Sequence, residues 1–327
     1  MAAGEFELID HYFKPAPDEL APDSVVLGIG DDGAIVQPDP AQQLVVAADT
    51  LVADVHFPAD ADPELVGERS LRVNLSDLAA MGATPAWFTL SLTLPPQWPE
   101  EARRRWVAGF SRGLKACARA YDCSLIGGDT TSGPLTVAIQ MLGQVPPGKA
   151  LRRDGAAVDD FVLVTHRLGD GAAALAALKG EVSFAPEHAS YLQQRFYRPE
   201  PRLLEGIVLR EIASSAQDIS DGLLADLGHL CAASDLAAEI DVAQLPLSRA
   251  LEALPCEQAY HWALTGGDDY ELVFTVAPDK MPLLAMAQAS GEIDASVIGR
   301  IVTGAGVHCE LDGKPYRLAR AGYRHFE

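Results

Sequence analysis

The chain has 327 residues, enough for two domains, and its apolar fraction of 48% is ordinary for a folded globular protein. The formal net charge of -21 argues against nucleic acid or an anionic membrane as the main partner, because binding to phosphate there depends on Lys and Arg. The five cysteines form no C-x-x-C motif, so a disulfide framework or a zinc site is not expected and a reducing cytoplasm is favoured.

Two further exclusions come from the hydrophobic pattern. The N-terminal residues 1–5 carry neither a basic segment nor an apolar one, so no signal peptide is predicted. No apolar run reaches the roughly 18 residues of a membrane-spanning helix, so no membrane association is expected.

The first half of the chain mixes strand and helix patterns. The apolar spacing predicts helices over Glu5–Phe13, Pro63–Met81 and Pro99–Tyr121, and strands over Val25–Ile29, Ala34–Gln37, Leu44–Ala48, Trp87–Leu94, Leu125–Ile126 and Leu135–Val145. Residues 146–149, Pro-Pro-Gly-Lys, interrupt this pattern and predict a domain boundary. We therefore expect an N-terminal domain over residues 1–148 and a C-terminal domain over residues 149–327, of α/β class and α+β type.

The second half of the chain also mixes helix and strand patterns. Helices are predicted over Gly171–Gly180, Glu187–Tyr197, Leu203–Ser214, Leu223–Ala233 and Pro278–Ala289, and strands over Asp160–Thr165, Ala237–Val242, Tyr270–Val276, Ser296–Ile301 and Val307–Arg317, the last with a turn at Asp312-Gly313.

A Gly/Asp turn, Gly28-Ile29-Gly30-Asp31-Asp32-Gly33, matches the spelling G-x-G-x-x-G of a dinucleotide-binding loop. Such a loop must open a helix, but Ala34-Ile35-Val36 reads as a strand, and two aspartates would repel a pyrophosphate. Two interpretations remain for this stretch taken alone, namely a hairpin turn and a metal site.

Carboxylates stand beside glycine, or at the end of an apolar run, in several stretches. They are Asp31/Asp32, Asp49, Asp77, Asp129 and Asp218/Asp221, with Asp268/Asp269 as a possible further group. Oxygen ligands favour magnesium over zinc, and magnesium takes few carboxylates and completes its shell with water and phosphate. The set therefore predicts several Mg²⁺ ions around a polyphosphate, an arrangement suited to phosphoryl transfer.

Each of these residues also has a structural interpretation. Asp218 or Asp221 fits a helix cap, and Asp77 fits a solvated helix face. Arg153 fits an ordinary surface charge as well as a phosphate contact. His56 and Tyr323 fit plain packing roles. The chain contains neither a Walker A motif nor the protein-kinase signatures, so an ATP enzyme here would use another scaffold.

Five motifs in a fixed order resemble those of the thiamine-monophosphate kinases, in the superfamily of aminoimidazole-ribonucleotide synthetase. They are Gly28-Ile29-Gly30-Asp31-Asp32, Asn74-Leu75-Ser76-Asp77-Leu78-Ala79-Ala80-Met81-Gly82, Gly127-Gly128-Asp129-Thr130-Thr131, Asp218-Ile219-Ser220-Asp221-Gly222 and Gly266-Gly267-Asp268-Asp269-Tyr270-Glu271-Leu272. The resemblance covers almost the whole chain. It implies a two-domain PurM-like fold, a homodimer paired through the N-terminal sheets, and ATP-dependent phosphorylation of thiamine monophosphate to thiamine diphosphate.

The resemblance also implies roles for particular residues. The positions that match metal ligands are Asp32, Asp49, Asp77, Asp129, Asp218 and Asp221; those that match nucleotide contacts are Gly128, Asp129, Arg153 and Ser220; those that match substrate contacts are His56, Asp268 and Tyr323. An aromatic face and a carboxylate both suit the cationic thiazolium. No residue is identified as a catalytic acid or base.

The chain departs from the family pattern in two ways. Ala47 and Ala48 stand where some relatives carry hydroxyl residues, so any metal contact there would use backbone carbonyls. Asp268 stands where relatives often have Glu, which is one methylene longer.

The alternatives are another ATP enzyme of the superfamily, making an aminoimidazole ribonucleotide or selenophosphate, and a non-catalytic acidic scaffold that binds metal. The absence of cysteine from the first 100 residues disfavours the selenophosphate reaction.

Overall fold

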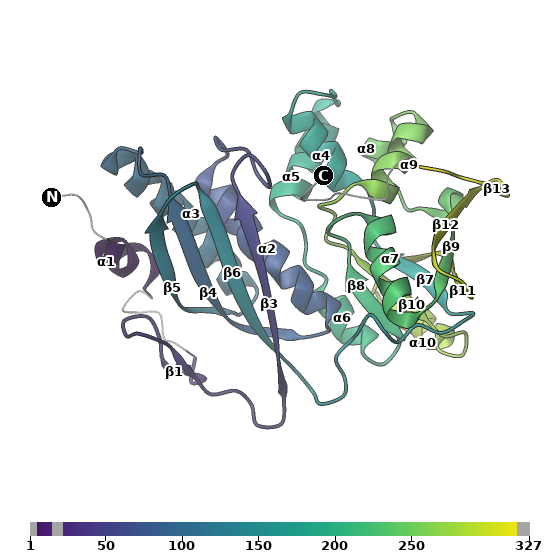
Figure 1. Ribbon diagram of the computed structural model, residues 1–327, viewed down its shortest axis with the longest axis horizontal. Coiled ribbons are helices and arrows are strands. Elements are labelled where there is room, and N and C mark those ends of the chain that lie inside the picture. Colours follow the sequence, from purple (N-terminus) through teal and green to yellow (C-terminus); the bar gives the residue numbers. More distant parts are fainter. Residues whose placement is uncertain (1–4, 15–21, 319–327) are drawn as a thin grey trace. The chain divides into compact units, whose positions relative to one another are not determined.

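The computed structural model describes residues 5–14 and 22–318 and divides the chain into two compact units (Figure 1). The first unit comprises Met1–Leu78 and Thr84–Pro147, and the second comprises Ala79–Ala83 and Gly148–Glu327. In the described part of the chain, no helix is long and apolar enough to cross a membrane.

The first unit is built on a four-stranded sheet with the strand order β3-β6-β4-β5. Its strands are β3 (Gln43–Val52), β4 (Thr84–Leu94), β5 (Ser124–Ser132) and β6 (Thr136–Val145). β6 runs antiparallel to β3 and β4, while β4 and β5 are parallel. Alternate residues of β6, including Val137, Ile139 and Met141, are buried, as expected for a strand with one face in the core.

Two long helices, α2 (Pro63–Ala80) and α3 (Glu100–Ala120), lie together on one face of this sheet (Figure 1). Glycines bring their backbones close, since a Cβ at Gly67 would lie 2.2 Å from the Phe110 carbonyl oxygen and one at Gly113 would lie 1.9 Å from that of Glu64. A short α-helix, α1 (Glu5–Leu8), and a π-helical turn, η1 (Ile9–Phe13), replace the single N-terminal helix that the sequence predicts.

The Gly/Asp turn connects a two-stranded hairpin. β1 (Val25–Leu27) pairs antiparallel with β2 (Ile35–Val36), so the exclusion of a dinucleotide loop is confirmed, because a strand and no helix follows Gly33. The predicted strand end at Ala48 is wrong. β3 pairs with β6 from Gln43 to Val52, which places Asp49 inside the strand.

The second unit contains a seven-stranded sheet with the order β13-β12-β9-β11-β7-β10-β8. Its strands are β7 (Phe161–Thr165), β8 (Ser215–Asp218), β9 (Ala237–Asp241), β10 (Leu272–Val276), β11 (Ala295–Val302), β12 (Gly306–Leu311) and β13 (Lys314–Pro315). All neighbours are antiparallel except β9 and β12. β12 and β13 form the predicted hairpin around Asp312-Gly313.

Helices surround this second sheet. They are α4 (Asp170–Leu178), α5 (Pro186–Tyr197), α6 (Leu203–Leu209), α7 (Leu223–Ser234), the 3-10 turn η2 (Val242–Gln244), α8 (Arg249–Glu252), α9 (Cys256–Thr265) and α10 (Met281–Ala289). The core joins the apolar face of α7 (Leu223, Leu227, Leu230) to Val164 of β7 and Val273 of β10. α6 is shorter than predicted, because Ser215 already pairs in β8, and the sequence analysis missed α8 and α9.

Candidate active site

In the first unit, the hairpin loop and the middle of β5 line one pocket of about 600 Å³. Asp31 and Asp32 come from the loop, and Gly128 and Asp129 come from β5. Lys14, which the sequence analysis did not single out, also lines the pocket, and its ammonium lies 2.6 Å from the Asp10 carboxylate. The structure therefore brings together two of the predicted metal positions, Asp32 and Asp129, beside the predicted nucleotide contact Gly128.

Gly128 occupies a position that accepts only glycine. Its φ is +150°, and a Cβ there would lie 1.8 Å from the backbone oxygen of Leu90 in β4. Two residues before Gly128, the pairing of β4 with β5 shifts by one residue. Phe88 pairs with Leu125, but the next residue, Thr89, pairs with Gly127, which leaves Ile126 unpaired with β4. The resulting bulge lies inside β5, so the prediction that the strand ends at these glycines is wrong.

Asp49 and Asp77 are related through a buried asparagine. The Asn74 side-chain oxygen accepts the backbone N–H of Asp49 at 3.0 Å, and its amide donates to the Ser70 carbonyl at 2.8 Å. Asp77 follows Asn74 by three residues on α2, which places both on neighbouring positions of one helix face. Asn74 thus fixes the middle of β3 against α2, a role that the sequence analysis did not assign to it.

His56 forms hydrogen bonds within the turn that contains it. The His56 ring Nδ1 accepts the backbone N–H of Val52 at 3.0 Å, and the backbone N–H of His56 donates to the Val52 carbonyl at 2.9 Å. This geometry requires an unprotonated Nδ1, so any hydrogen bond from the ring to a substrate would come from Nε2.

In the second unit, the Ser220-Asp221-Gly222 turn follows Asp218, the last residue of β8. The predicted alternative that Asp218 or Asp221 caps α7 is wrong, because Gly222 is the N-cap residue and no side chain caps it. The Asp226 carboxylate instead accepts the backbone N–H groups of all three turn residues, at 3.0, 3.0 and 3.1 Å. Burial raises the pKa of Asp226 to about 7, with the charge of Asp218 as the second cause.

The Gly266–Tyr270 loop lies against the same turn. The Asp268 N–H donates to the Ser220 carbonyl at 2.9 Å, and the Tyr270 N–H donates to that of Ile219 at 2.8 Å. Asp268 and Tyr270 both have positive φ, at 68° and 52°, and the Tyr270 hydroxyl donates to the Asp268 carboxylate at 2.9 Å. The structure therefore joins the predicted nucleotide contact Ser220 to the predicted substrate contact Asp268. Strained backbone of this kind persists only where its surroundings hold it.

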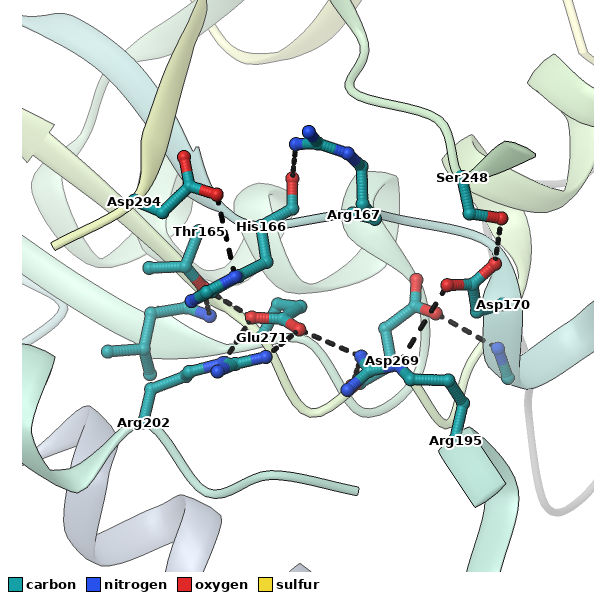
Figure 2. A network of polar contacts seen from close by, with 12 residues as sticks. Thr165, His166, Arg167, Asp170, Arg195, Arg202, Ser248, Asp269, Glu271 and Asp294 are labelled. Atoms are coloured by element: carbon teal, nitrogen blue, oxygen red, sulfur yellow. Dashed lines mark hydrogen bonds and ion pairs between the residues drawn. The ribbon is translucent and has the colours of Figure 1, made fainter. Parts of the chain in front are cut away.

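Asp269 and Glu271 belong to a buried polar network that anchors this loop (Figure 2). The Asp269 carboxylate accepts the N–H groups of Gly169 and Gly171, at 2.7 and 3.1 Å, and burial raises its pKa well above the usual range. Glu271 pairs with Arg202 and Arg195. Asp269 is 1% exposed and both of its carboxylate oxygens already accept backbone N–H groups, so its observed role is to hold this loop.

Arg153 and Tyr323 are the remaining predicted positions. Arg153 is exposed, and its backbone carbonyl accepts the Ser234 hydroxyl at 3.0 Å. Arg152 beside it pairs with Asp154, which lowers the pKa of that carboxyl. Tyr323 lies outside the described residues.

The predicted metal positions offer oxygen ligands. Within residues 5–14 and 22–318, no three His, Cys, Asp or Glu side chains lie close enough together to form a ready-made metal site. The acids that gather at the first unit's pocket, Asp31, Asp32 and Asp129, offer only carboxylate oxygens, and this chemistry fits a hard cation such as Mg²⁺.

The sequence was compared with known proteins. Residues 30–145 match the family described as AIR synthase related protein, N-terminal domain, and residues 157–312 match its C-terminal domain. A curated thiamine-monophosphate kinase of Escherichia coli (strain K12) is 46% identical over 329 residues, which cover 100% of this chain and 99% of that protein.

Solved structures agree with these matches. The thiamine-monophosphate kinase from Stenotrophomonas maltophilia K279a is 46% identical with a TM-score of 0.81, over 90% of this chain and 93% of that one. AaThiL complexed with AMPPCP and TMP is 33% identical with a TM-score of 0.76, over 91% of this chain and 92% of that one. The predicted two-domain PurM-like α/β fold is thereby confirmed. This chain belongs to the thiamine-monophosphate kinase family, within the AIR synthase related proteins.

Proposed function

We propose that this chain transfers the terminal phosphoryl group of ATP to thiamine monophosphate, giving thiamine diphosphate and ADP. One observation carries the proposal, namely 46% identity to a thiamine-monophosphate kinase over the full length of this chain. A second supports it, because a solved structure that matches 91% of this chain is a relative complexed with AMPPCP and TMP.

The pocket of the first unit supplies the phosphate side of the reaction. Gly128 leaves its backbone open to a phosphate, and Lys14 adds a positive charge. Asp32 and Asp129, with Asp49 and Asp77, would hold several Mg²⁺ ions. When bound, these ions neutralise charge on the transferring phosphoryl group.

The second unit supplies the remaining groups in this proposal. Asp218 and Asp221 would complete the metal ligands, while Ser220 and Arg153 would contact the nucleotide. The positions proposed to bind the substrate are Asp268, His56 and Tyr323. We propose residues 1–148 and 149–327 as the two functional domains. The chain's own work is to position two phosphates in line, since an ionised phosphate acceptor has its attacking oxygen already free.

The test is an assay of the purified full-length protein with ATP, Mg²⁺ and thiamine monophosphate, followed by separation of the products. We expect equal amounts of thiamine diphosphate and ADP, with neither formed when the substrate or Mg²⁺ is left out. Folded protein that forms no thiamine diphosphate would exclude the kinase activity. If it still bound Mg²⁺, the non-catalytic scaffold would be favoured, and ATP turnover with another superfamily substrate would favour the other ATP enzymes.

We also propose that the chain forms a homodimer through its first unit. The apolar residues Leu44 and Val46 of the edge strand β3 are 44% and 54% exposed, and Val26 and Ile35 of the hairpin are 64% and 54% exposed. Exposed apolar side chains on an edge strand are typical of an interface. The cysteine pattern favours a cytoplasmic location for this assembly.

Val46→Glu is expected to convert the dimer to a monomer, because a charge placed in an apolar interface stays unpaired. Light scattering coupled to gel filtration measures the mass. Met286→Glu is the matched control, since Met286 of α10 in the second unit is 68% exposed and is expected to leave the dimer intact. A wild-type monomer, or a Val46→Glu dimer, would contradict this assignment.

A further inference from the structure

Asp226 is a buried carboxylate whose hydrogen bonds all go to one short segment. One oxygen, Oδ2, accepts the N–H groups of Ser220, Asp221 and Gly222, and Oδ1 accepts the side-chain amide of Gln217 at 2.9 Å. The residue is 2% exposed and lies in the first turn of α7. Four donors from six consecutive residues thus converge on this carboxylate.

The three backbone donors form a concavity that elsewhere in proteins binds phosphate. Here the protein's own carboxylate fills it, so these N–H groups are already used. Any ligand of this turn must therefore meet side chains or carbonyl oxygens, and among these the carboxylates of Asp218 and Asp221 and the carbonyl oxygens bind cations. A concavity that is closed to anions is consistent with the proposal that this turn binds a cation through Asp218 and Asp221.

The turn is also fixed from its other side. Ser220 donates its backbone N–H to Asp226, while its backbone carbonyl oxygen accepts the Asp268 N–H at 2.9 Å. Gly222 has a φ of +112°, and a Cβ there would lie 2.8 Å from the backbone of Thr265. A displacement of the turn would therefore be transmitted to the loop that carries Asp268.

We propose that Asp226 is a positioning residue for phosphoryl transfer, which aligns the Asp218–Gly222 turn with the Asp268 loop. This inference rests on the proposed kinase function. Asn in place of Asp226 keeps the size of the side chain but has no charge and one acceptor oxygen where Asp has two, so its NH₂ group would meet either the turn N–H groups or the Gln217 amide, both of which are donors. The turn would then lose part of its support, and misplacement by about 1 Å costs on the order of 100-fold in rate.

The test compares Asp226→Asn with Asp160→Asn in the full-length protein. Asp160 is a matched control, because it is 1% exposed, lies in the same unit and accepts one backbone N–H, that of Ala157 at 3.0 Å. We expect Asp226→Asn to lower kcat about 100-fold and Asp160→Asn to change it by no more than about twofold. Asp226→Glu keeps the charge, is expected to fold, and still displaces the turn, so its kcat is also expected to fall about tenfold or more.

Amide hydrogen exchange over the turn gives a readout that does not depend on turnover. Faster exchange of the Ser220, Asp221 and Gly222 amides is expected in Asp226→Asn and not in Asp160→Asn. If the wild type makes no thiamine diphosphate, the kinase function fails, and the affinity for Mg²⁺ with AMPPCP, measured by calorimetry, then decides the positioning role. The positioning role is overturned if Asp226→Asn and Asp226→Glu both have the same kcat as Asp160→Asn. For an inactive wild type, it is overturned if both variants have the same affinity for Mg²⁺ with AMPPCP as Asp160→Asn.

Discussion

Glu271→Ala is expected to lower the free energy of unfolding by about 3–5 kcal/mol, because it leaves the buried Arg202 and the half-buried Arg195 without their shared counter-ion. Arg202 donates to both oxygens of Glu271 at 2.7 Å, and Arg195 donates to Oε1 at 2.8 Å. The Thr165 hydroxyl adds a further bond at 2.6 Å. Figure 2 shows this carboxylate at the centre of the network, and its exposed fraction is 0%.

Denaturation by urea, followed by circular dichroism, measures the loss. The control is Glu211→Ala in the same unit, where the Glu211 side chain is 66% exposed and pairs with Lys149 at 2.7 Å. An exposed pair contributes at most about 1 kcal/mol. Equal losses in the two variants would show that the Glu271 pairs add nothing beyond a surface contact.

The same network explains why the Gly266–Tyr270 loop holds its strained conformation. Arg195 also donates to the Asp269 carbonyl at 3.3 Å, and the Glu271 carbonyl accepts the Ile219 N–H at 2.8 Å. The loop is thereby tied to α5 on one side and to the end of β8 on the other. We expect the stability of this region and the placement of Asp268 to change together.

Most regular elements could be predicted from the sequence because their apolar spacing has one interpretation. Helix α2 was predicted to within one residue of its end, and the exclusion of a dinucleotide loop followed from the strand after Gly33. α9 was missed, since Cys256–Thr265 mixes polar and apolar residues without a clear stripe. The ends of β3 and β5 were misplaced because strand partners, which local pattern does not reveal, extend both strands through Asp49 and Gly128.

Some residues of the candidate site could likewise be predicted from the sequence, and others could not. Asp32, Gly128 and Asp129 could be grouped in advance, because glycine beside aspartate marks a close backbone approach. Asp226 could not be recognised, since an acid in the first turn of a helix is ordinary. Asp269 and Asp268 are adjacent and chemically identical in the sequence. Only the tertiary contacts show that Asp269 is buried against the N–H groups of Gly169 and Gly171, whereas Asp268 is partly exposed.

Asp77→Asn is expected to lower kcat by about 100-fold or more while leaving the fold intact. Asp77 lies three residues after Asn74, whose side chain holds the Asp49 backbone, so two predicted metal positions meet at one contact between α2 and β3. The amide keeps the size of the side chain but removes its charge, so it binds Mg²⁺ poorly and no longer offsets the charge of the cation.

Steady-state kinetics with varied Mg²⁺ measure the effect, and the Mg²⁺ concentration for half-maximal rate is expected to rise as kcat falls. Glu64→Gln is the matched control, because Glu64 is on the same helix, its side chain is 43% exposed, and it pairs with Arg112 at 3.1 Å. That variant is expected to change kcat by no more than about twofold, since an exposed charge pair contributes little. Near-normal activity of Asp77→Asn would remove Asp77 from the metal ligands and leave Asp49 held by Asn74 for a structural reason alone.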